Sequence, residues 1–113
     1  LHETVGLYRK ATDEGRTRCL AWMERFGVED LWQKNYLTRS SGQQRLMLLV
    51  RAFVKHPDLL ILDEPFHGLD NHARWKARRI IDEYMYASDK RTLIMVTHYP
   101  EELPTCINRI KRL

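Results

Sequence analysis

The sequence predicts an α/β fold in which a helical lobe precedes part of a parallel sheet flanked by helices. Two observations carry this prediction. A capped helical pattern over 40–55 leads into a short aliphatic run at 59–62, which is typical of a buried strand. A second helical pattern over 71–87 leads into another aliphatic run at 92–97. Strand, helix and strand in this order form a unit whose two strands run parallel.

The composition indicates a globular protein without a membrane span. The chain has 113 residues, of which 43% are hydrophobic and 30% are charged, as is ordinary for a soluble domain or part of one. No apolar run approaches the roughly 20 residues that a membrane helix needs, so we expect any role at a membrane to depend on a partner protein. Because the chain opens at Leu1 without a methionine, and 1–10 lacks the apolar core of a secretory signal, we expect a piece of a longer protein.

The cysteines and the charge argue against two other classes of protein. Cys19 and Cys106 lie far apart and neither belongs to a C-x-x-C pair, so we expect reduced, partly buried thiols in a cytosolic protein rather than a zinc site. The net charge is +4, with basic residues gathered at 74–79 and 109–112. A solvated helix face and chain end explain these clusters. The alternative, a nucleic-acid surface, lacks a recognition motif and interleaved aromatic residues.

The first third of the chain is predicted to be helical. We expect helices over 1–10 and 12–26, the second capped by Thr12 and ended by Gly27, and a short helical piece over 29–34. The second helix carries one apolar face, formed by Cys19, Leu20, Trp22, Met23 and Phe26. This part is therefore expected to pack as a helical lobe.

The helix over 40–55 begins with a pattern that suits an anion. Ser40 can cap this helix, and Ser41, Gly42 and Gln43 then open it with backbone N–H groups that lack a partner within the helix. Such a helix end attracts negative charge, and glycine lets a ligand approach the backbone closely. The apolar stripe of the helix comprises Leu46, Leu49, Val50 and Phe53.

The aliphatic strand that follows ends in two carboxylates. Pro57 stops the helix, and the uninterrupted apolar run 59–62 is expected to be buried on both faces of a parallel sheet. The run ends abruptly in Asp63 and Glu64. Two carboxylates at the end of a strand suggest a magnesium ligand and a general base.

The second strand brings a histidine to the same edge of the sheet. Asp70 or Asn71 caps the helix over 71–87, and His98 follows the strand over 92–97. Because ligands bind beyond the carboxyl ends of parallel strands, we expect His98 to converge with the two carboxylates. The apolar side of this helix comprises Trp75, Ala77, Ile80, Ile81, Tyr84 and Met85.

The end of the chain is predicted to return to the sheet. A short helical or turn segment is expected over 100–106. The pattern over 107–113 is typical of a final strand, which would lie at the edge of the sheet.

Four short motifs in this order resemble the ATP-binding cassette (ABC) ATPases. SSGQ at 40–43 is similar to the family's signature motif, and LLILDEP at 59–65 is similar to its Walker B strand. GLD at 68–70 is similar to its D-loop, and the histidine of VTH at 96–98 to its switch histidine. The resemblance covers essentially the whole chain but only the later part of a cassette. Within the family, GLYRKAT and HYPEELPTCINR resemble the cytoplasmic ATP-binding proteins of molybdate transport.

The resemblance implies a partial cassette in two parts. Residues 1–38 would form the helical lobe, and 39–113 the signature helix and the C-terminal part of a P-loop NTPase-like ATPase core. The phosphate-binding loop G-x-x-x-x-G-K-[ST] occurs nowhere in the sequence, and the family's glutamine-bearing Q-loop cannot be placed. We therefore expect the chain to bear half of each composite ATP site and to be inactive by itself.

The resemblance also implies two cofactors, ATP and Mg²⁺, and a role for each strand-end residue. Asp63 would hold Mg²⁺, usually through water, and Glu64 would act as general base on the attacking water. His98 would contact the γ-phosphate of ATP. The carboxyl edge of the sheet is thus the expected catalytic half of the site.

The signature would serve a second cassette. Residues 40–43 would contact ATP held by the opposite cassette, and Asp70 would sit across the same interface. Two positions depart from the family pattern, because Arg39 stands where the family has leucine and Ser41 where it has its first glycine. Serine keeps the side chain small and adds a hydroxyl group, which leaves phosphate contact feasible.

The implied function is that of the ATP-binding and ATP-hydrolysing subunit of an ABC transporter. Its partners would be a second ABC cassette, bound head to tail, and a transmembrane permease subunit. It would be cytoplasmic and peripheral at the inner membrane. Tyr8, Trp22 and Trp32 are candidates for the permease contact, but we favour core packing for each of them.

Two other functions stay open. An ABC-type ATPase of DNA repair or chromosome maintenance shares the head chemistry, but such heads carry a long coiled coil before the signature, and no sustained heptads precede residue 40. A non-catalytic ABC module would keep the signature and lose hydrolysis, which the presence of both Glu64 and His98 argues against. A nucleic-acid partner is not expected, and the sequence does not identify the transported solute.

Overall fold

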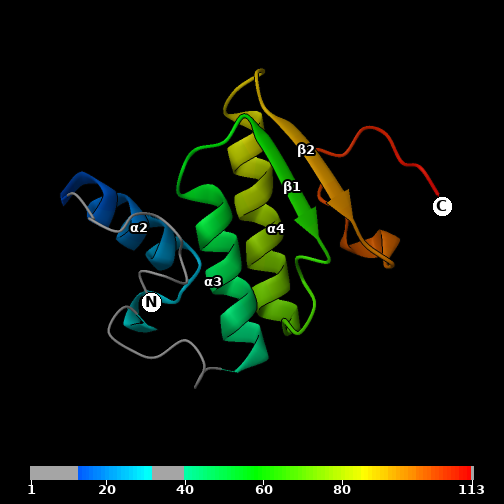
Figure 1. Ribbon diagram of the computed structural model, residues 1–113. Helices are drawn as coiled ribbons and strands as arrows, with labels where there is room; N and C mark the ends of the chain where they lie inside the picture. Colours follow the sequence, from blue (N-terminus) through cyan, green and yellow to red (C-terminus); the bar gives the residue numbers. More distant parts are fainter. Residues whose placement is uncertain (1–12, 32–39, 113) are drawn as a thin grey trace.

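The computed structural model describes residues 13–31 and 40–112. The elements, in chain order, are the helix α2 (Asp13–Arg25), the 3₁₀ helix η1 (Glu29–Leu31), the helix α3 (Ser41–Phe53), the strand β1 (Leu59–Asp63), the helix α4 (Asn71–Tyr86), the strand β2 (Thr92–Val96) and the 3₁₀ helix η3 (Pro100–Glu102). β1 and β2 pair in parallel, and α4 connects them (Figure 1). The structure confirms the predicted α/β fold with parallel strands.

Several predictions concern residues outside this description. They are the helix over 1–10, the cap Thr12, the permease candidates Tyr8 and Trp32, and the departure at Arg39. Of the short helical piece predicted over 29–34, η1 covers the first three residues. The division of the chain at residue 38 likewise stays a prediction.

The predicted caps and stops set the helix ends. α3 follows its cap Ser40, as predicted, and ends at Phe53, slightly earlier than expected. The chain then turns at His56, whose φ of 50° is left-handed. α2 ends at Arg25, and Gly27, with a φ of 75°, turns the chain beyond it as predicted.

The two faces of the sheet differ in burial. Because β1 and β2 pair in register, alternate residue pairs share a face. Leu60 and Leu62 are buried beneath the helices, whereas Leu59 and Ile61 are 53% and 62% exposed. The prediction that β1 is buried on both faces is therefore wrong for the described residues. Among these, α3 and α4 pack on one face and no element covers the other.

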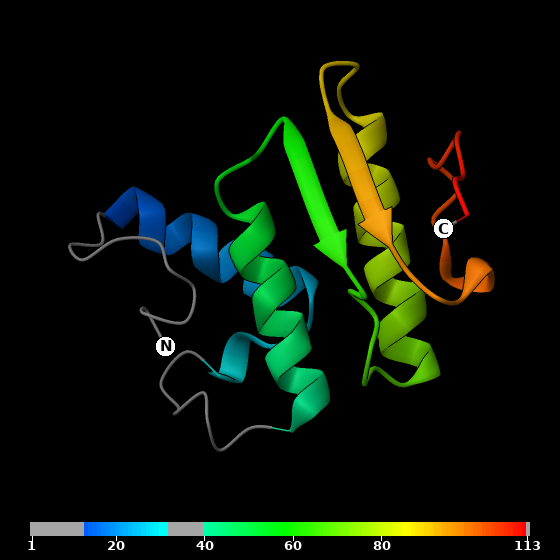
Figure 2. The ribbon, with the colours of Figure 1, turned by 45° about the vertical axis from the view of Figure 1, so that its right-hand side comes forward.

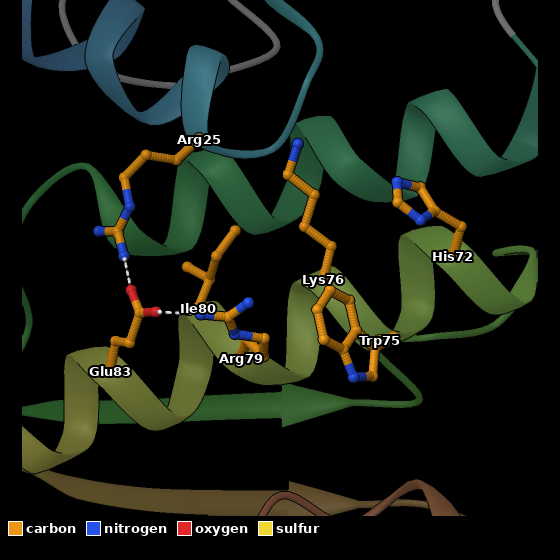
Figure 3. A pocket seen from close by; sticks show the side chains of 7 residues that line it. All are labelled: Arg25, His72, Trp75, Lys76, Arg79, Ile80 and Glu83. Carbon is orange, nitrogen blue, oxygen red and sulfur yellow. Dashed lines mark hydrogen bonds and ion pairs between the residues drawn. The ribbon is translucent and has the colours of Figure 1, made fainter.

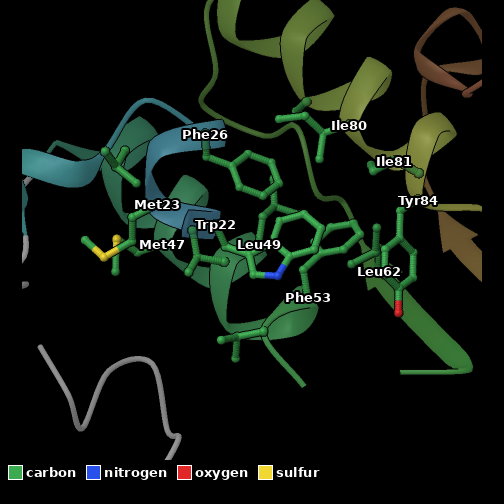
Figure 4. Packing of buried hydrophobic residues seen from close by; sticks show 14 of the residues in the cluster. Trp22, Met23, Phe26, Met47, Leu49, Phe53, Leu62, Ile80, Ile81 and Tyr84 are labelled. Atoms are coloured by element: carbon green, nitrogen blue, oxygen red, sulfur yellow. The ribbon is translucent and has the colours of Figure 1, made fainter. Parts of the chain in front are cut away.

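One apolar cluster joins α2, α3, α4 and the covered face of the sheet (Figure 4). Trp22 stacks on Phe53 with ring centroids 4.9 Å apart, and Phe53 meets Tyr84 edge to face, also at 4.9 Å. Trp22 is only 5% exposed, which confirms the core-packing interpretation for this residue. Buried aromatic side chains of this size dominate the energetics of such a core.

The two cysteines belong to this packing. Cys19 is fully buried, and burial raises the pKa of its thiol to about 11. Cys106 is half-buried, and burial, followed by a hydrogen bond to Asp82, raises its pKa to about 12. Both are free thiols, as predicted, and both stay protonated at neutral pH. Neither is therefore a candidate nucleophile.

The basic run of α4 is not uniformly solvated, contrary to prediction. Arg74 lies 3.6 Å from the carboxylate of Glu102, and Arg78 donates a hydrogen bond to the carbonyl of Leu103 at 3.2 Å. Both side chains thus turn back toward the segment around η3. Long guanidinium side chains reach such partners while their stems stay on the surface.

Trp75 does not join the apolar side of α4, where it was predicted. Its side chain is 54% exposed. The reason is helical geometry, since Trp75 precedes the buried Ala77 by two positions and so lies about 200° around the helix from it. The remaining buried residues of α4 are Ile80, Ile81 and Tyr84.

The final strand predicted over 107–113 does not form in the described part of this segment. Residues 107–112 adopt neither helix nor strand, and Figure 2 shows them apart from both strands. The N–H of Ile107 donates to the carbonyl of Pro104 at 3.3 Å, so the chain turns before it reaches the sheet. Without a neighbouring ladder of hydrogen bonds a strand is not stabilised.

Candidate functional site

The predicted site residues gather at one end of the molecule. The carboxyl ends of β1 and β2 lie there, together with the amino ends of α3 and α4 (Figure 1). The first N–H groups of a helix lack partners within the helix and carry partial positive charge. This end of the molecule is therefore suited to an anionic ligand.

The sheet brings Glu64 and His98 into contact, as predicted. The backbone N–H of His98 donates to Oε1 of Glu64 at 3.0 Å, and Nε2 of the imidazole lies 3.5 Å from the same oxygen. The side chain of Glu64 is 25% exposed and that of His98 is 84% exposed. Within the described residues, Oε2 of Glu64 accepts no hydrogen bond. One carboxylate oxygen is thus fixed and the other is available to a ligand.

The backbone at Glu64 sets this geometry. Its φ of 47° is left-handed, which is uncommon for a residue with a Cβ atom. Its N–H donates to the carbonyl of Val96 at 2.8 Å and so continues the ladder beyond the end of β1. Left-handed conformations of non-glycine residues cluster at functional sites, where neighbouring structure holds them in place.

Asp63 lies beside this pair but does not contact it. It ends β1 opposite Val96, and its side chain is exposed on the uncovered face of the sheet. Across residues 13–31 and 40–112, no three His, Cys, Asp or Glu side chains gather as a metal cluster. Mg²⁺ usually takes one or two carboxylates and completes its shell with waters and phosphate oxygens. Asp63 therefore fits as a single protein ligand of a nucleotide-bound Mg²⁺.

Two residues that sequence reasoning missed hold the loops around this site. Glu102, only 7% exposed, accepts a hydrogen bond from Oγ1 of Thr97 at 3.2 Å and lies 3.6 Å from Arg74. Arg74 also donates to the carbonyl of Leu69 at 3.1 Å. The turn after β1 and the segment that carries His98 are thus tied to one buried carboxylate. Nothing in the local sequence distinguishes Glu102 and Arg74 from their charged neighbours.

The signature residues form the predicted cap of α3. The N–H of Gln43 donates to Oγ of Ser40 at 3.1 Å, and the N–H of Ser40 donates to the side-chain oxygen of Gln43 at 3.2 Å. The two residues form a capping box. In the described part of the chain, the N–H groups of Ser41 and Gly42 have no hydrogen-bond partner. These two amides are the ones that an anion can take.

The turn after β1 packs closely on the signature. A Cβ atom at Gly42 would lie 3.0 Å from the carbonyl oxygen of Gly68, and one at Gly68, whose φ is 83°, would lie 3.3 Å from Oγ of Ser41. Both positions therefore favour glycine, because a Cβ atom at Gly42 would press on backbone and the left-handed φ of Gly68 strains other residues. Asp70, at the end of the turn, caps α4 by accepting a hydrogen bond from the N–H of Ala73 at 2.8 Å. The predicted signature and D-loop segments are thus neighbours within one chain.

Comparisons with known sequences agree with the motifs. The profile of the ABC transporter family matches residues 2–67. ABC transporter ATP-binding protein ModF of Escherichia coli K12 is 38% identical over 106 residues, which cover 93% of this chain and 21% of that protein. Aliphatic sulfonates import ATP-binding protein SsuB 3 of Paraburkholderia xenovorans is 36% identical over 112 residues, which cover 97% of this chain and 44% of that protein. The chain thus spans between about a fifth and less than half of these relatives.

Solved structures share the fold. A dimeric bacterial ABC transporter cassette matches 88% of this chain and 44% of its own with a TM-score of 0.72 at 24% identity. An inward-facing ABC transporter of metal-chelate type matches 89% of this chain and 41% of its own with a TM-score of 0.67 at 21% identity. The predicted fold, that of a P-loop NTPase-like ABC cassette, is thereby confirmed for this part. Since the family profile matches more than half of its residues, the chain belongs to the ABC transporter family of ATP-binding proteins.

Proposed function

We propose that this chain supplies half of each composite ATP-hydrolysis site in an ABC transporter ATPase. The contact between Glu64 and His98 at the carboxyl edge of the parallel sheet carries the proposal. Glu64 is the general base for the attacking water, because its Oε1 is fixed by a backbone amide while Oε2 is free to accept a proton. His98, on the exposed side of the pair, contacts the γ-phosphate.

ATP and Mg²⁺ are the cofactors of this proposal. Asp63, exposed at the end of β1, holds Mg²⁺ through water, and the metal neutralises charge on the phosphates. Phosphate oxygens and waters complete the metal shell, which suits a site with one protein carboxylate. Glu64 keeps its role as a base because it points toward His98 rather than toward the metal ligand.

The signature serves ATP that a second cassette holds, bound head to tail. The free amides of Ser41 and Gly42 bind its phosphates, while Ser40 and Gln43 keep the helix end rigid. Asp70 lies across the same interface. The close packing of Gly42 on Gly68 supports this arrangement, since it keeps the signature and the D-loop in fixed relation. A solved cassette of the same fold is dimeric.

The second partner in this proposal is a transmembrane permease. No helix within 13–31 and 40–112 is long and apolar enough to cross a membrane. Relatives include proteins named for thiamine import and for aliphatic sulfonates import, so one fold serves several solutes. We place the protein in the cytoplasm, peripheral at the inner membrane. Molybdate, suggested by the sequence, stays a prediction.

The test is Glu64→Gln in the full-length protein. Hydrolysis should slow by about a hundredfold or more, the scale of a lost general base, while ATP binding is kept. Because ATP closes the dimer and hydrolysis opens it, the variant should accumulate as an ATP-bound dimer in size-exclusion chromatography with ATP and Mg²⁺. Glu101→Gln, at an exposed site, is the matched control. Near-normal turnover would remove Glu64 from this role, and an inactive parent protein would favour the non-catalytic alternative.

A further inference from the structure

A groove lies between the end of α2 and one side of α4, and it runs from His72, in the first turn of α4, toward Glu83 (Figure 3). It encloses about 340 Å³. The polar and aromatic side chains that line it are Arg25, His72, Trp75, Lys76, Arg79 and Glu83. Those of α4 stand at positions 72, 75, 76, 79 and 83, which share one side of the helix and form one stripe roughly 16 Å long. The groove is therefore elongated along a helix.

The groove carries an excess of positive charge. Arg25, Lys76 and Arg79 face a single carboxylate, that of Glu83, which leaves a net charge of three minus one, or +2. Glu83 is already engaged, because Oε2 accepts from Arg25 at 3.0 Å and Oε1 lies 3.6 Å from Arg79. Lys76 has no ion pair or hydrogen bond within the described chain, although its ammonium lies close to Gly27. The groove is thus complementary to an anion beside Lys76.

An exposed aromatic ring lies next to these cations. Trp75 is 54% exposed, and the guanidinium of Arg79 lies 5.0 Å from its ring centre. Its indole N–H donates to no group in the described residues. A large apolar side chain that is half in solvent and backed by arginine is a frequent anchor in protein interfaces.

We propose that this groove docks an acidic peptide segment of a partner protein, with a carboxylate at Lys76 and one apolar side chain on Trp75. Its elongated, concave form fits a single chain segment, whereas a flat membrane surface would not enter it. Duplex nucleic acid needs a longer row of free cations. α4 does not offer one, because Arg74 and Arg78 turn away to Glu102 and Leu103.

The experiment uses the full chain and an array of acidic peptides of about twelve residues, long enough for a three-turn groove. Each peptide is rich in aspartate and glutamate and carries one leucine or phenylalanine. The indole N–H signals of ¹⁵N-labelled tryptophan report binding. A subset of peptides should shift the signal of Trp75 saturably. The signal of Trp22, whose indole donates to His56, should stay in place and so serves as an internal check of folding.

Charge variants locate the site. Lys76→Glu should weaken binding by about tenfold or more, since it places like charges together, and the milder Lys76→Gln by about threefold. Lys90→Glu changes the net charge equally at an exposed position outside the groove and should leave binding unchanged. The proposal is overturned if no peptide shifts Trp75, or if Lys90→Glu weakens binding as much as Lys76→Glu. Duplex DNA or anionic vesicles that shift Trp75 more strongly than any peptide would also overturn it.

Discussion

The amino end of α3 is held together by residues three positions apart, Ser40 and Gln43, whereas Glu64 and His98 meet across 34 positions of sequence. In the function that we propose, both arrangements present groups to a phosphate ligand. The first is fixed by a local capping box and exists wherever the helix exists. The second requires β1 and β2 to pair, and Glu102 contacts residues of the two segments beside it. We call the cap at Ser40 and Gln43, with the turn that packs on it, the local half of the site, and the Glu64–His98 contact, with the residues that hold its loops, the long-range half. The two halves should respond differently to substitution.

The largest effect is expected in the local half. In the full-length protein, Ser40→Arg should reduce hydrolysis by about a hundredfold or more, because in the proposed arrangement the bulky side chain displaces the signature from ATP held by the second cassette. Binding of ATP to the substituted subunit itself should be nearly unchanged. Turnover and nucleotide titration of the same variant separate the two effects. Asn108→Arg adds the same charge at an exposed position and is the control. Loss of nucleotide affinity in the monomer would contradict the assignment of the signature to the opposite cassette.

A smaller but broader effect is expected in the long-range half. Glu102→Ala removes the carboxylate that Thr97 and Arg74 share, and leaves the Arg74 guanidinium, partly buried, without its ion partner. The free energy of unfolding should fall by about 2 kcal/mol, the scale of a lost hydrogen bond to a charged group. Turnover should fall as well, because the segment that carries His98 loosens. Chemical denaturation and ATPase assays measure the two.

Glu101→Ala is the matched control, since Glu101 is exposed in the same 3₁₀ helix. Its unfolding midpoint should match that of the parent protein. If Glu102→Ala and Glu101→Ala have the same unfolding midpoint, the contacts of Glu102 do not stabilise the long-range half. The proposed difference between the two halves would then be wrong for this residue.

The same contrast explains what the sequence could predict. The cap at Ser40, the turn at Gly27 and the parallel pairing of β1 with β2 follow from residue type and spacing, and the structure confirms them. Convergence of Glu64 with His98 followed from topology alone, because parallel strands end at one edge. Their catalytic roles stay predictions.

Other features depended on three-dimensional neighbours that no local pattern encodes. The partnership of Arg74 with Glu102 joins residues in different elements, and an arginine in a basic run carries no sign of it. Leu59 and Ile61 are apolar, as expected of a parallel sheet that is covered on both faces. In the described residues, however, helices cover one face only. The segment 107–112 has a strand pattern and lacks a strand to pair with.

A third substitution tests the local half by stability alone. Asp70→Ala removes the side-chain acceptor for the N–H of Ala73 and should cost about 1 kcal/mol, the usual value of an N-cap. Asp70→Ser keeps a capping oxygen and should stay within a few tenths of a kcal/mol of the parent. Thermal or chemical unfolding compares the two. Equal losses would show that Asp70 acts through contacts other than this cap.

The smallest effect expected is a pH dependence of folding stability. It distinguishes a long-range contact that involves a histidine from the local cap at Ser40, because serine does not titrate. His56 accepts a hydrogen bond from the indole of Trp22 at 3.4 Å, across 34 positions. Partial desolvation, and the positive charges of Arg18 and Arg91, lower the pKa of His56 below its usual 6.5, although its side chain is exposed. The unfolded chain therefore binds this proton more readily, so stability is complete above pH 6.5 and declines as pH falls from 6.5 toward the folded-state pKa. Urea midpoints at pH 7.5 and 5.5 should show this loss.

The control variant is His56→Asn, because asparagine tolerates the left-handed backbone and does not titrate. It should flatten the slope of stability against pH. An unchanged slope in that variant would assign the acid sensitivity to other groups.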